Sequence, residues 1–193
     1  MTCWGNNVSG QSTPPPGIFI QISAGGHHTC GVKNNGTLAC WGENSFNQSS
    51  PPSGTFIQVS AGYFFTCGLK NDGTLTCWGR NDENQTISPA GTFTQVSAGD
   101  LHACGQKSDG TLVCWGLNDK TQSTPPIGTF TQVSAGYLHT CGLRGDGTPA
   151  CWGDNEFGKS TPPSGELFSR VQVSAGVNHT CAVKSDGTVV CWG

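Results

Sequence analysis

The chain has few charged residues and no excess of basic ones. Only 11% of its 193 residues are charged, and 9 Lys and Arg stand against 12 Asp and Glu, for a formal net charge of -3. Proteins that bind nucleic acid present clustered positive charge that neutralises phosphates. We therefore expect no nucleic-acid partner.

Long apolar runs and catalytic motifs are also missing. Uninterrupted apolar stretches extend over only a few residues, far short of the roughly 20 that cross a membrane, so no membrane span is expected. Only Met1 and Thr2 precede the first cysteine, so we expect any secretion signal to lie outside this sequence. No nucleophile motif, phosphate-binding loop or metal signature occurs. The chain is predicted not to be an enzyme and to bind no cofactor or metal.

Glycine and one repeated tripeptide dominate what is present. The chain holds 29 Gly and 11 Pro, and Cys-Trp-Gly occurs six times, beginning at Cys3, Cys40, Cys77, Cys114, Cys151 and Cys191. Such a period indicates copies of one supersecondary unit that bury each other's apolar faces. We assign copies to residues 3–39, 40–76, 77–113, 114–150 and 151–190, a partial copy to 191–193, and a single domain to residues 1–193.

Alternation and turn residues predict the strands of each copy. Residues 93–99, 102–107 and 111–116 are expected to be strands, and 108–110 (Ser-Asp-Gly) a hairpin loop closed by a left-handed glycine. The Gln-Ser-Thr-Pro-Pro stretch is expected to form a short outer strand, whose prolines cannot donate to a further ladder. The fold class is therefore all-β, with four strands in each copy.

The hairpin register places cysteines opposite each other. A loop centred on Asp109 pairs Cys104 with Cys114 at a site where a cross-strand disulfide is feasible. The same register pairs Cys30 with Cys40, Cys67 with Cys77, Cys141 with Cys151, and Cys181 with Cys191, and it leaves Cys3 unpaired. Five disulfides would imply an oxidising compartment, hence a secreted or cell-surface protein. The alternative is buried free thiols that fill space between sheets.

Tryptophan and histidine recur at fixed positions and are expected to be structural. Each Trp follows the cysteine of its tripeptide and is predicted to wedge between adjacent sheets. Histidine occupies one register position in four copies (His28, His102, His139 and His179), and Phe65 replaces it in another. Equivalent positions on neighbouring sheets lie about 10 Å apart, too far for one metal ion, so we expect hydrogen bonds to loop backbone.

These motifs carry a family resemblance. Trp-Gly-x-Asn, Val-Ser-Ala-Gly-x-x-His-Thr-Cys and Lys-x-Asp-Gly-Thr-x-x-Cys-Trp-Gly resemble the regulator of chromosome condensation repeat over essentially the whole chain. The resemblance implies a β-propeller with one four-stranded blade per repeat, usually seven blades, where this chain has five. The paired cysteines resemble those of secreted bacterial members rather than the nuclear exchange factor. In function, the resemblance points to bacterial β-lactamase inhibitors of propeller type.

Closure of the predicted propeller has alternatives. Residues 1–5 and 189–193 occupy the same repeat phase and would compete for one strand position in a ring of five blades. We expect a five-bladed ring in which N-terminal residues supply the last outer strand. An arc of a larger ring and strand exchange between chains are the other possibilities.

Positions that vary between the copies are the candidate binding residues. The loops between the first two strands of each copy are expected on one face, and aromatic and apolar residues there would form a protein-binding patch. The candidate binding residues in these loops are His27 (which follows Gly26), Tyr63, Phe64, Asp100, Leu101, Tyr137, Leu138, Val177 and Asn178. The resemblance to propeller-type inhibitors, which bind through aromatics in equivalent loops, supports this hypothesis. Ordinary loop variation is the alternative.

A second variable set follows Trp-Gly-x-Asn, where Gly or Asn at the last position suggests a left-handed turn more than a site. Glycosylation sequons occur at Asn7, Asn35, Asn47, Asn84 and Asn178.

The sequence thus predicts an extracellular protein-binding or inhibitor-like module. The alternative is a glycosylated building block of a cell-surface assembly or filament, whose copies join through their mismatched termini. The expected partner is another protein under the first hypothesis and a second copy of this chain under the alternative.

Overall fold

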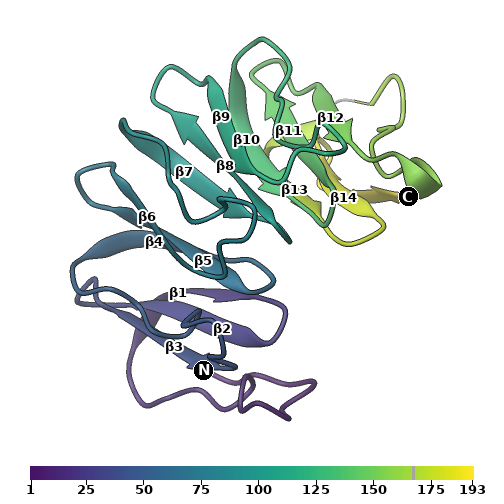
Figure 1. Cartoon of the computed structure of the whole chain (residues 1–193). Helices are drawn as coiled ribbons and strands as arrows, with labels where there is room; N and C mark the ends of the chain where they lie inside the picture. Colours follow the sequence, from purple (N-terminus) through teal and green to yellow (C-terminus); the bar gives the residue numbers. More distant parts are fainter. Residues whose placement is uncertain (167) are drawn as a thin grey trace.

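The computed structural model describes residues 1–166 and 168–193, and its architecture is all-β (Figure 1). Five antiparallel sheets of three strands follow one another along the chain. The first strands are β1 (Phe19–Ala24), β4 (Phe56–Ala61), β7 (Phe93–Ala98), β10 (Phe130–Ala135) and β13 (Phe168–Ala175). The second strands are β2 (His28–Lys33), β5 (Phe65–Lys70), β8 (His102–Lys107), β11 (His139–Arg144) and β14 (Thr180–Lys184). The third strands are β3 (Leu38–Gly42), β6 (Leu75–Gly79), β9 (Leu112–Gly116), β12 (Pro149–Gly153) and β15 (Val189–Trp192).

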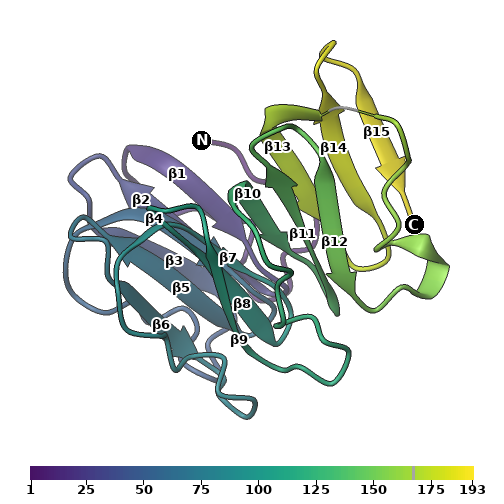
Figure 2. The same cartoon turned by 90° about the horizontal axis from the view of Figure 1, so that it is seen from above.

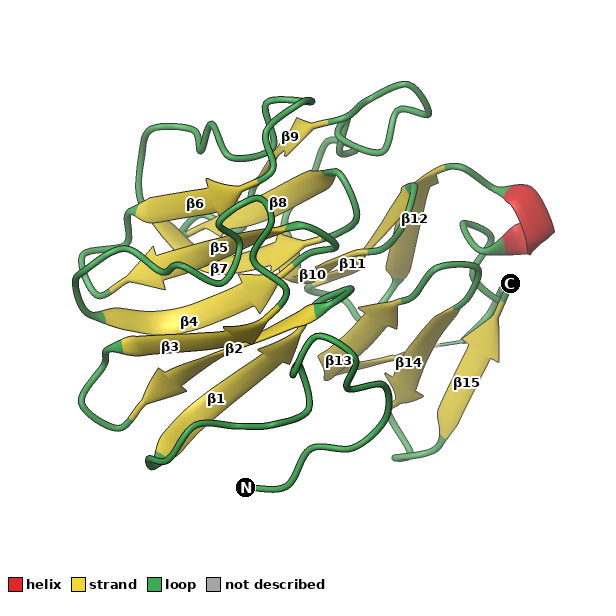
Figure 3. Ribbon diagram, turned by 60° about the horizontal axis from the view of Figure 1, so that its bottom comes forward, coloured by secondary structure: helices red, strands yellow, loops and turns green. Residues whose placement is uncertain are grey.

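The sheets are arranged in a fan. Figure 2 shows them in sequence order from β1–β3 to β13–β15, and the first strands of successive sheets contact one another. The connecting segments are loops, and a short 3-10 turn, η1 (Glu156–Gly158), lies near the C-terminus (Figure 3). In Figure 1 the first and last sheets stand at opposite ends of the arc.

Each hairpin between second and third strands is closed by an aspartate or asparagine. Asp109 Oδ1 accepts hydrogen bonds from Thr111 N at 2.9 Å and Thr111 Oγ1 at 2.6 Å. Gly110 follows with a φ of 82°, a left-handed conformation that glycine adopts without strain. The expected Ser-Asp-Gly loop is confirmed, and the third strand begins at Leu112, one residue later than predicted.

The predicted hairpin register is also confirmed. Cys104 lies opposite Cys114, Gly105 opposite Val113 and Gln106 opposite Leu112. All five expected disulfides are formed, and their Cα atoms are 4.0 to 4.1 Å apart. Cys3 is the free cysteine of the described residues.

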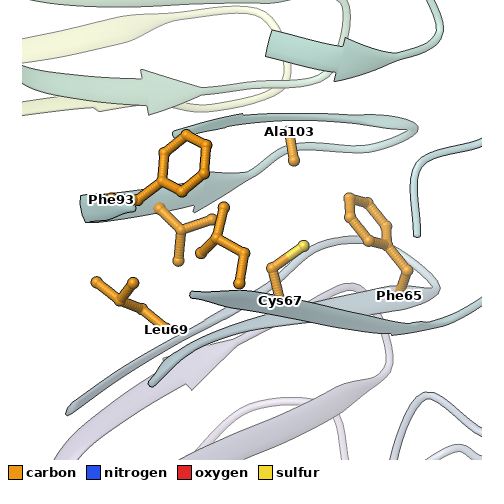
Figure 4. Close-up of a cluster of buried hydrophobic side chains, with 7 residues drawn as sticks. Phe65, Cys67, Leu69, Phe93 and Ala103 are labelled. Atoms are coloured by element: carbon orange, nitrogen blue, oxygen red, sulfur yellow. The ribbon is translucent and has the colours of Figure 1, made fainter. Parts of the chain in front are cut away.

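Tryptophans wedge between neighbouring sheets, as predicted. Trp78 of β6 packs against a buried cluster that joins Cys30 and Val32 of the preceding sheet to Val59 of its own sheet, and its indole N–H donates to the carbonyl of Gln48 at 2.9 Å. Figure 4 shows the next interface, where Phe65 and Cys67 of β5 face the sheet that carries Phe93 and Ala103. Trp4 departs from the pattern, because 86% of it is exposed.

Polar side chains of one sheet bind the backbone of the next. Gln58 Nε2 donates to Val96 O at 3.1 Å, while Gln58 Oε1 accepts from Val96 N at 3.0 Å. Ser60 Oγ accepts from Ala98 N at 2.9 Å. Equivalent residues repeat all three contacts at two other interfaces. At the last interface Gln132 Oε1 accepts from Val173 N and Ser134 Oγ accepts from Ala175 N. We call these side chains the edge-capping glutamines (Gln21, Gln58, Gln95 and Gln132) and serines (Ser23, Ser60, Ser97 and Ser134).

Three of the four recurrent histidines are structural, but their partners differ from the expected loop backbone. Their Nε2 atoms bond threonine hydroxyls of the following sheet at 2.7 to 2.8 Å, in the pairs His28–Thr66, His102–Thr140 and His139–Thr180. Where Phe65 replaces histidine, Ala103 replaces the threonine, so an apolar pair fills the same space. Burial lowers the pKa of His28 to about 4, of His102 to about 3 and of His139 to about 4.

Two expectations about the blades are not met. The Gln-Ser-Thr-Pro-Pro segments form turns, and each described sheet has three strands. In the second such turn, the side chains satisfy the local backbone: Gln48 Oε1 accepts from Phe46 N at 2.9 Å and Asn44 Oδ1 accepts from Ser49 N at 2.8 Å. The N-terminal residues supply no strand to the last sheet. They lie against the first sheet, where Gln11 O accepts from Trp41 Nε1 at 2.9 Å.

The buried histidines predict a loss of stability in acid. Their folded pKa values lie below the unfolded value of about 6.5, so the unfolded chain binds more protons, and stability falls as the pH drops from about 6.5 toward 4. Each histidine is expected to cost roughly 2 to 3 kcal/mol at pH 4.5. The double variant His102→Phe/Thr140→Ala, which copies the Phe65–Ala103 pair, should lose less stability between pH 7 and 4.5 in urea unfolding.

A matched control is His179→Phe, because His179 is exposed. This variant should keep the wild-type difference between the two pH values. An equal acid sensitivity of the double variant and the wild type would contradict the role assigned to the buried pair.

Candidate functional site

The turns between first and second strands meet at one end of the fan. Main-chain hydrogen bonds join them in series: Gly26 N donates to Gly62 O, Tyr63 N to Gly99 O, Asp100 N to Gly136 O and Tyr137 N to Gly176 O, at 3.1 to 3.2 Å. The sequence placed the variable residues on these turns. The structure brings them together because each turn is bonded to the next.

These turns enclose a concave cavity of about 790 Å³. Its wall contains the Ala-Gly step that ends each first strand, from Ala24 and Gly25 to Ala175 and Gly176. Six of the predicted site residues also line it: Tyr63, Phe64, Asp100, Leu101, Tyr137 and Val177. Small residues in the wall leave the space open, and the variable residues determine its chemistry.

An aromatic cluster lies at one side of this cavity. The Tyr63 and Phe64 rings are 4.6 Å apart, and His27 stacks on Phe64 with centroids 5.9 Å apart. Phe46 contacts Phe64 at 5.4 Å, and the Arg80 guanidinium lies 5.6 Å from the Phe46 centroid and 6.0 Å from that of Phe64. We call these five residues the aromatic cluster.

Asp100 and Arg80 are the charged residues of the cavity wall. Arg80 Nε donates to Asp82 Oδ2 at 2.6 Å, so its charge is already paired. Within the part of the chain that the structure describes, the Asp100 carboxylate makes no hydrogen bond or ion pair. Burial raises the pKa of Asp100, and the nearby Arg80 charge opposes this shift.

Two predicted residues, Leu138 and Asn178, do not line the cavity, and His27 reaches it only through contacts with Tyr63 and Phe64. In the first four sheets, the carbonyl of the second turn residue accepts from the residue that follows the third strand of its own sheet; the carbonyl of Leu138, for example, accepts from Asp154 N at 2.9 Å. This bond does not decide which second residues face the cavity, because Phe64 and Leu101 make it and line the cavity, whereas Leu138 makes it and does not.

Sequence reasoning missed Phe46 and Arg80. Phe46 belongs to the variable turn after Trp-Gly-x-Asn, which was interpreted as a turn more than a site. The left-handed turn itself is confirmed, because Asn47 and Asn84 have φ values of 64° and 60°. Arg80 follows Cys-Trp-Gly at a position that differs in every copy, and this variability was the available signal.

The sequon asparagines lie outside the cavity wall, and several have structural roles. Asn35 Oδ1 accepts from Thr37 N and Oγ1 in the hairpin turn where the other copies have aspartate, and Asn7 Nδ2 donates to Thr13 Oγ1 at 2.9 Å. Asn47 and Asn84 occupy the left-handed turns. Glycosylation at any of the five sites stays a prediction.

Neither a metal cluster nor a membrane helix is found. Among residues 1–166 and 168–193, no group of three His, Cys, Asp or Glu side chains is placed to hold a metal ion. In the same residues, no helix has the length and apolarity to cross a bilayer.

Comparison with known proteins identifies the repeats. The model of the regulator of chromosome condensation (RCC1) repeat matches residues 19–48, 56–85, 93–122, 130–159 and 171–193. No curated protein sequence matches the chain.

Solved structures share the fold. The ectodomain of the Physcomitrella patens receptor kinase CR4 superposes with a TM-score of 0.83 at 29% identity, over 98% of this chain and 55% of that one. The CRINKLY WD40 ectodomain of the Arabidopsis thaliana receptor kinase ACR4 gives 0.74 at 30% identity, over 91% and 63%. Yeast RCC1 (Prp20), solved bound to Kap60, gives 0.76 at 19% identity, over 91% and 56%, which shows the fold alone.

This chain therefore spans less than two thirds of the length of these structures. The five matched repeats cover most of the chain. Its sheets superpose on those of the solved propeller structures. The chain belongs to the family of proteins built from the regulator of chromosome condensation (RCC1) repeat.

Proposed function

We propose that this chain is an extracellular, inhibitor-like protein-binding module that uses the cavity face. The observation that carries the proposal is the aromatic cluster beside an open concave surface. Tyr63 is 42% exposed and Phe46 is 41% exposed, although both rings are packed against Phe64. Aromatic and arginine side chains held in place by their neighbours are the residues that dominate binding energy in protein interfaces.

The scaffold supports such a role because it holds the turns without using their variable side chains. The main-chain bonds between successive turns and the edge-capping contacts are made by repeated residues. The variable side chains are therefore free to contact a partner. A rigid surface loses little conformational entropy on binding, which favours affinity.

We propose further that the module works without enzymatic activity, in an oxidising extracellular setting. The titratable side chains of the cavity wall are Arg80, Asp100 and two tyrosines, and they form no nucleophile and base pair among the described residues. Five disulfides are typical of extracellular proteins. The receptor-kinase ectodomains that share the fold support the same location.

Loss of two aromatic side chains should strongly weaken partner capture. Wild-type and Tyr63→Ala/Phe64→Ala chains are each used as bait for extracellular proteins of the native source. The variant bait should retain at least tenfold less of the partner than the wild-type bait, because removal of an interface hot spot costs about 2 kcal/mol or more. The measurement is quantitative mass spectrometry of the retained proteins, with the baits matched for intact disulfides and thermal unfolding.

The control bait is Ile127→Ala, which removes a fully exposed apolar side chain (100% exposed) that does not line the cavity. It should retain the partner like the wild type. Equal retention by the double variant and the control would overturn the proposed use of this face.

A second candidate function is assembly into a larger ring or filament, and the polarity of the repeated interface favours it. At each of the four interfaces one sheet supplies a glutamine and a serine, and the next supplies backbone groups. At three of them the first sheet also supplies a histidine, and the next a threonine. The last sheet exposes Gln172, Ser174 and His179. The first sheet offers the backbone of Ile22, which is 38% exposed where the equivalent Val59 is 1% exposed. The two faces are complementary, so a second copy can dock head to tail.

Analytical ultracentrifugation tests this candidate. Wild-type chain at 100 µM should sediment as dimers or larger species, and Ser174→Arg/His179→Asp should shift it to monomers, because both changes place charge in the docking face. The same double variant should still capture the partner described above. A wild-type chain that remains monomeric at this concentration would exclude head-to-tail assembly.

A further inference from the structure

Asp100 is the one carboxylate of the cavity wall, and its position in the repeat is informative. The equivalent residues in successive copies are Gly26, Tyr63, Asp100, Tyr137 and Val177, so a tyrosine occupies this position on each side of Asp100. Tyr63 N donates to Gly99 O, directly before Asp100, and Asp100 N donates to Gly136 O, directly before Tyr137. Tyr63, Asp100 and Tyr137 therefore lie on three neighbouring turns that backbone hydrogen bonds join, and all three residues line the same cavity.

Among the described residues, no cation forms an ion pair with the Asp100 carboxylate. Arg80 lies in the same wall, but its guanidinium is bonded to Asp82 and placed over the rings of Phe46 and Phe64. Asp100 is half-buried, and none of the described residues donates to its side chain. A carboxylate that is partly removed from water without a partner is costly, and a cation from outside relieves that cost.

The surroundings suit a long basic side chain. Tyr137, which is 41% exposed, offers a ring face that attracts a cation within about 6 Å. The Tyr63 ring instead lies against Gly26, and its hydroxyl is 3.3 Å from His27 Nε2, both in the preceding copy. The Ala-Gly steps of the wall provide small apolar surface for methylene groups. Lysine and arginine bury such stems on apolar surface while the charged head reaches a polar partner.

We propose that Asp100, with Tyr137, forms a recognition subsite for a lysine or arginine side chain presented by the protein partner. The inference rests on the proposed binding function of the cavity face and specifies the chemistry that this face selects. A surface segment of the partner inserts its basic side chain into the cavity, and the aromatic cluster contacts apolar residues beside it.

The test uses a peptide in place of the unidentified partner. Acetyl-Ala-Arg-Ala-amide is titrated into ¹⁵N-labelled chain, and amide shifts are followed by NMR. The dissociation constant is expected in the millimolar range, with shifts at Asp100, Leu101 and Tyr137. The citrulline peptide, which has the same shape without the charge, should bind at least tenfold more weakly, and added salt should weaken the arginine peptide because it screens the charge pair.

Asp100→Asn should lower the affinity for the arginine peptide at least tenfold, while the spectrum elsewhere reports an intact fold. Glu156→Gln removes the same charge at η1, away from the cavity wall, and should leave the affinity unchanged. Equal binding of the arginine and citrulline peptides, tighter binding of acetyl-Ala-Glu-Ala-amide, or an Asp100→Asn variant with wild-type affinity would each overturn the subsite. If capture still depends on Tyr63 and Phe64 in that case, the binding face stands and only the basic subsite falls.

Discussion

The edge-capping contacts between sheets are the interaction on which the rest of the structure depends. A three-stranded sheet leaves the outer backbone edge of its first strand without partners, and such edges invite aggregation. Here Gln58 and Ser60 bond that edge on the next sheet, at Val96 and Ala98. Because the same residues recur in each copy, one contact set fixes the spacing and the order of all five sheets. Disulfides and tryptophans then hold each sheet together and fill the space between neighbours.

The candidate site follows from this arrangement. Edge capping holds successive first strands side by side, so the turns after them are bonded into one series around a cavity. A residue that varies between copies at this position changes the cavity without disturbing the scaffold. Asp100 between two tyrosines and the aromatic cluster beside them are therefore specific features placed on a repeated framework.

Local features could be predicted from the sequence, and contacts between sheets could not. The pairing of Cys104 with Cys114 follows from a three-residue loop, because a hairpin fixes the register over a few residues. The histidine partners depend on how two sheets are placed, although the joint replacement at Phe65 and Ala103 carried that signal in the sequence. The expected fourth strand was wrong because side chains such as Gln48 satisfy the backbone of a turn. Arg80 was missed because it joins the cavity from a different loop.

Hydrogen–deuterium exchange of individual backbone amides tests the edge-capping account most directly. The amides of Val59, Val96 and Val133 donate to glutamine side chains of the preceding sheet, so they should exchange slowly despite lying on the outer edge of their strands. The equivalent amide of Ile22, which receives no glutamine from a preceding sheet among the described residues, should exchange rapidly and serves as the internal reference. Rapid exchange at all four positions would contradict the account.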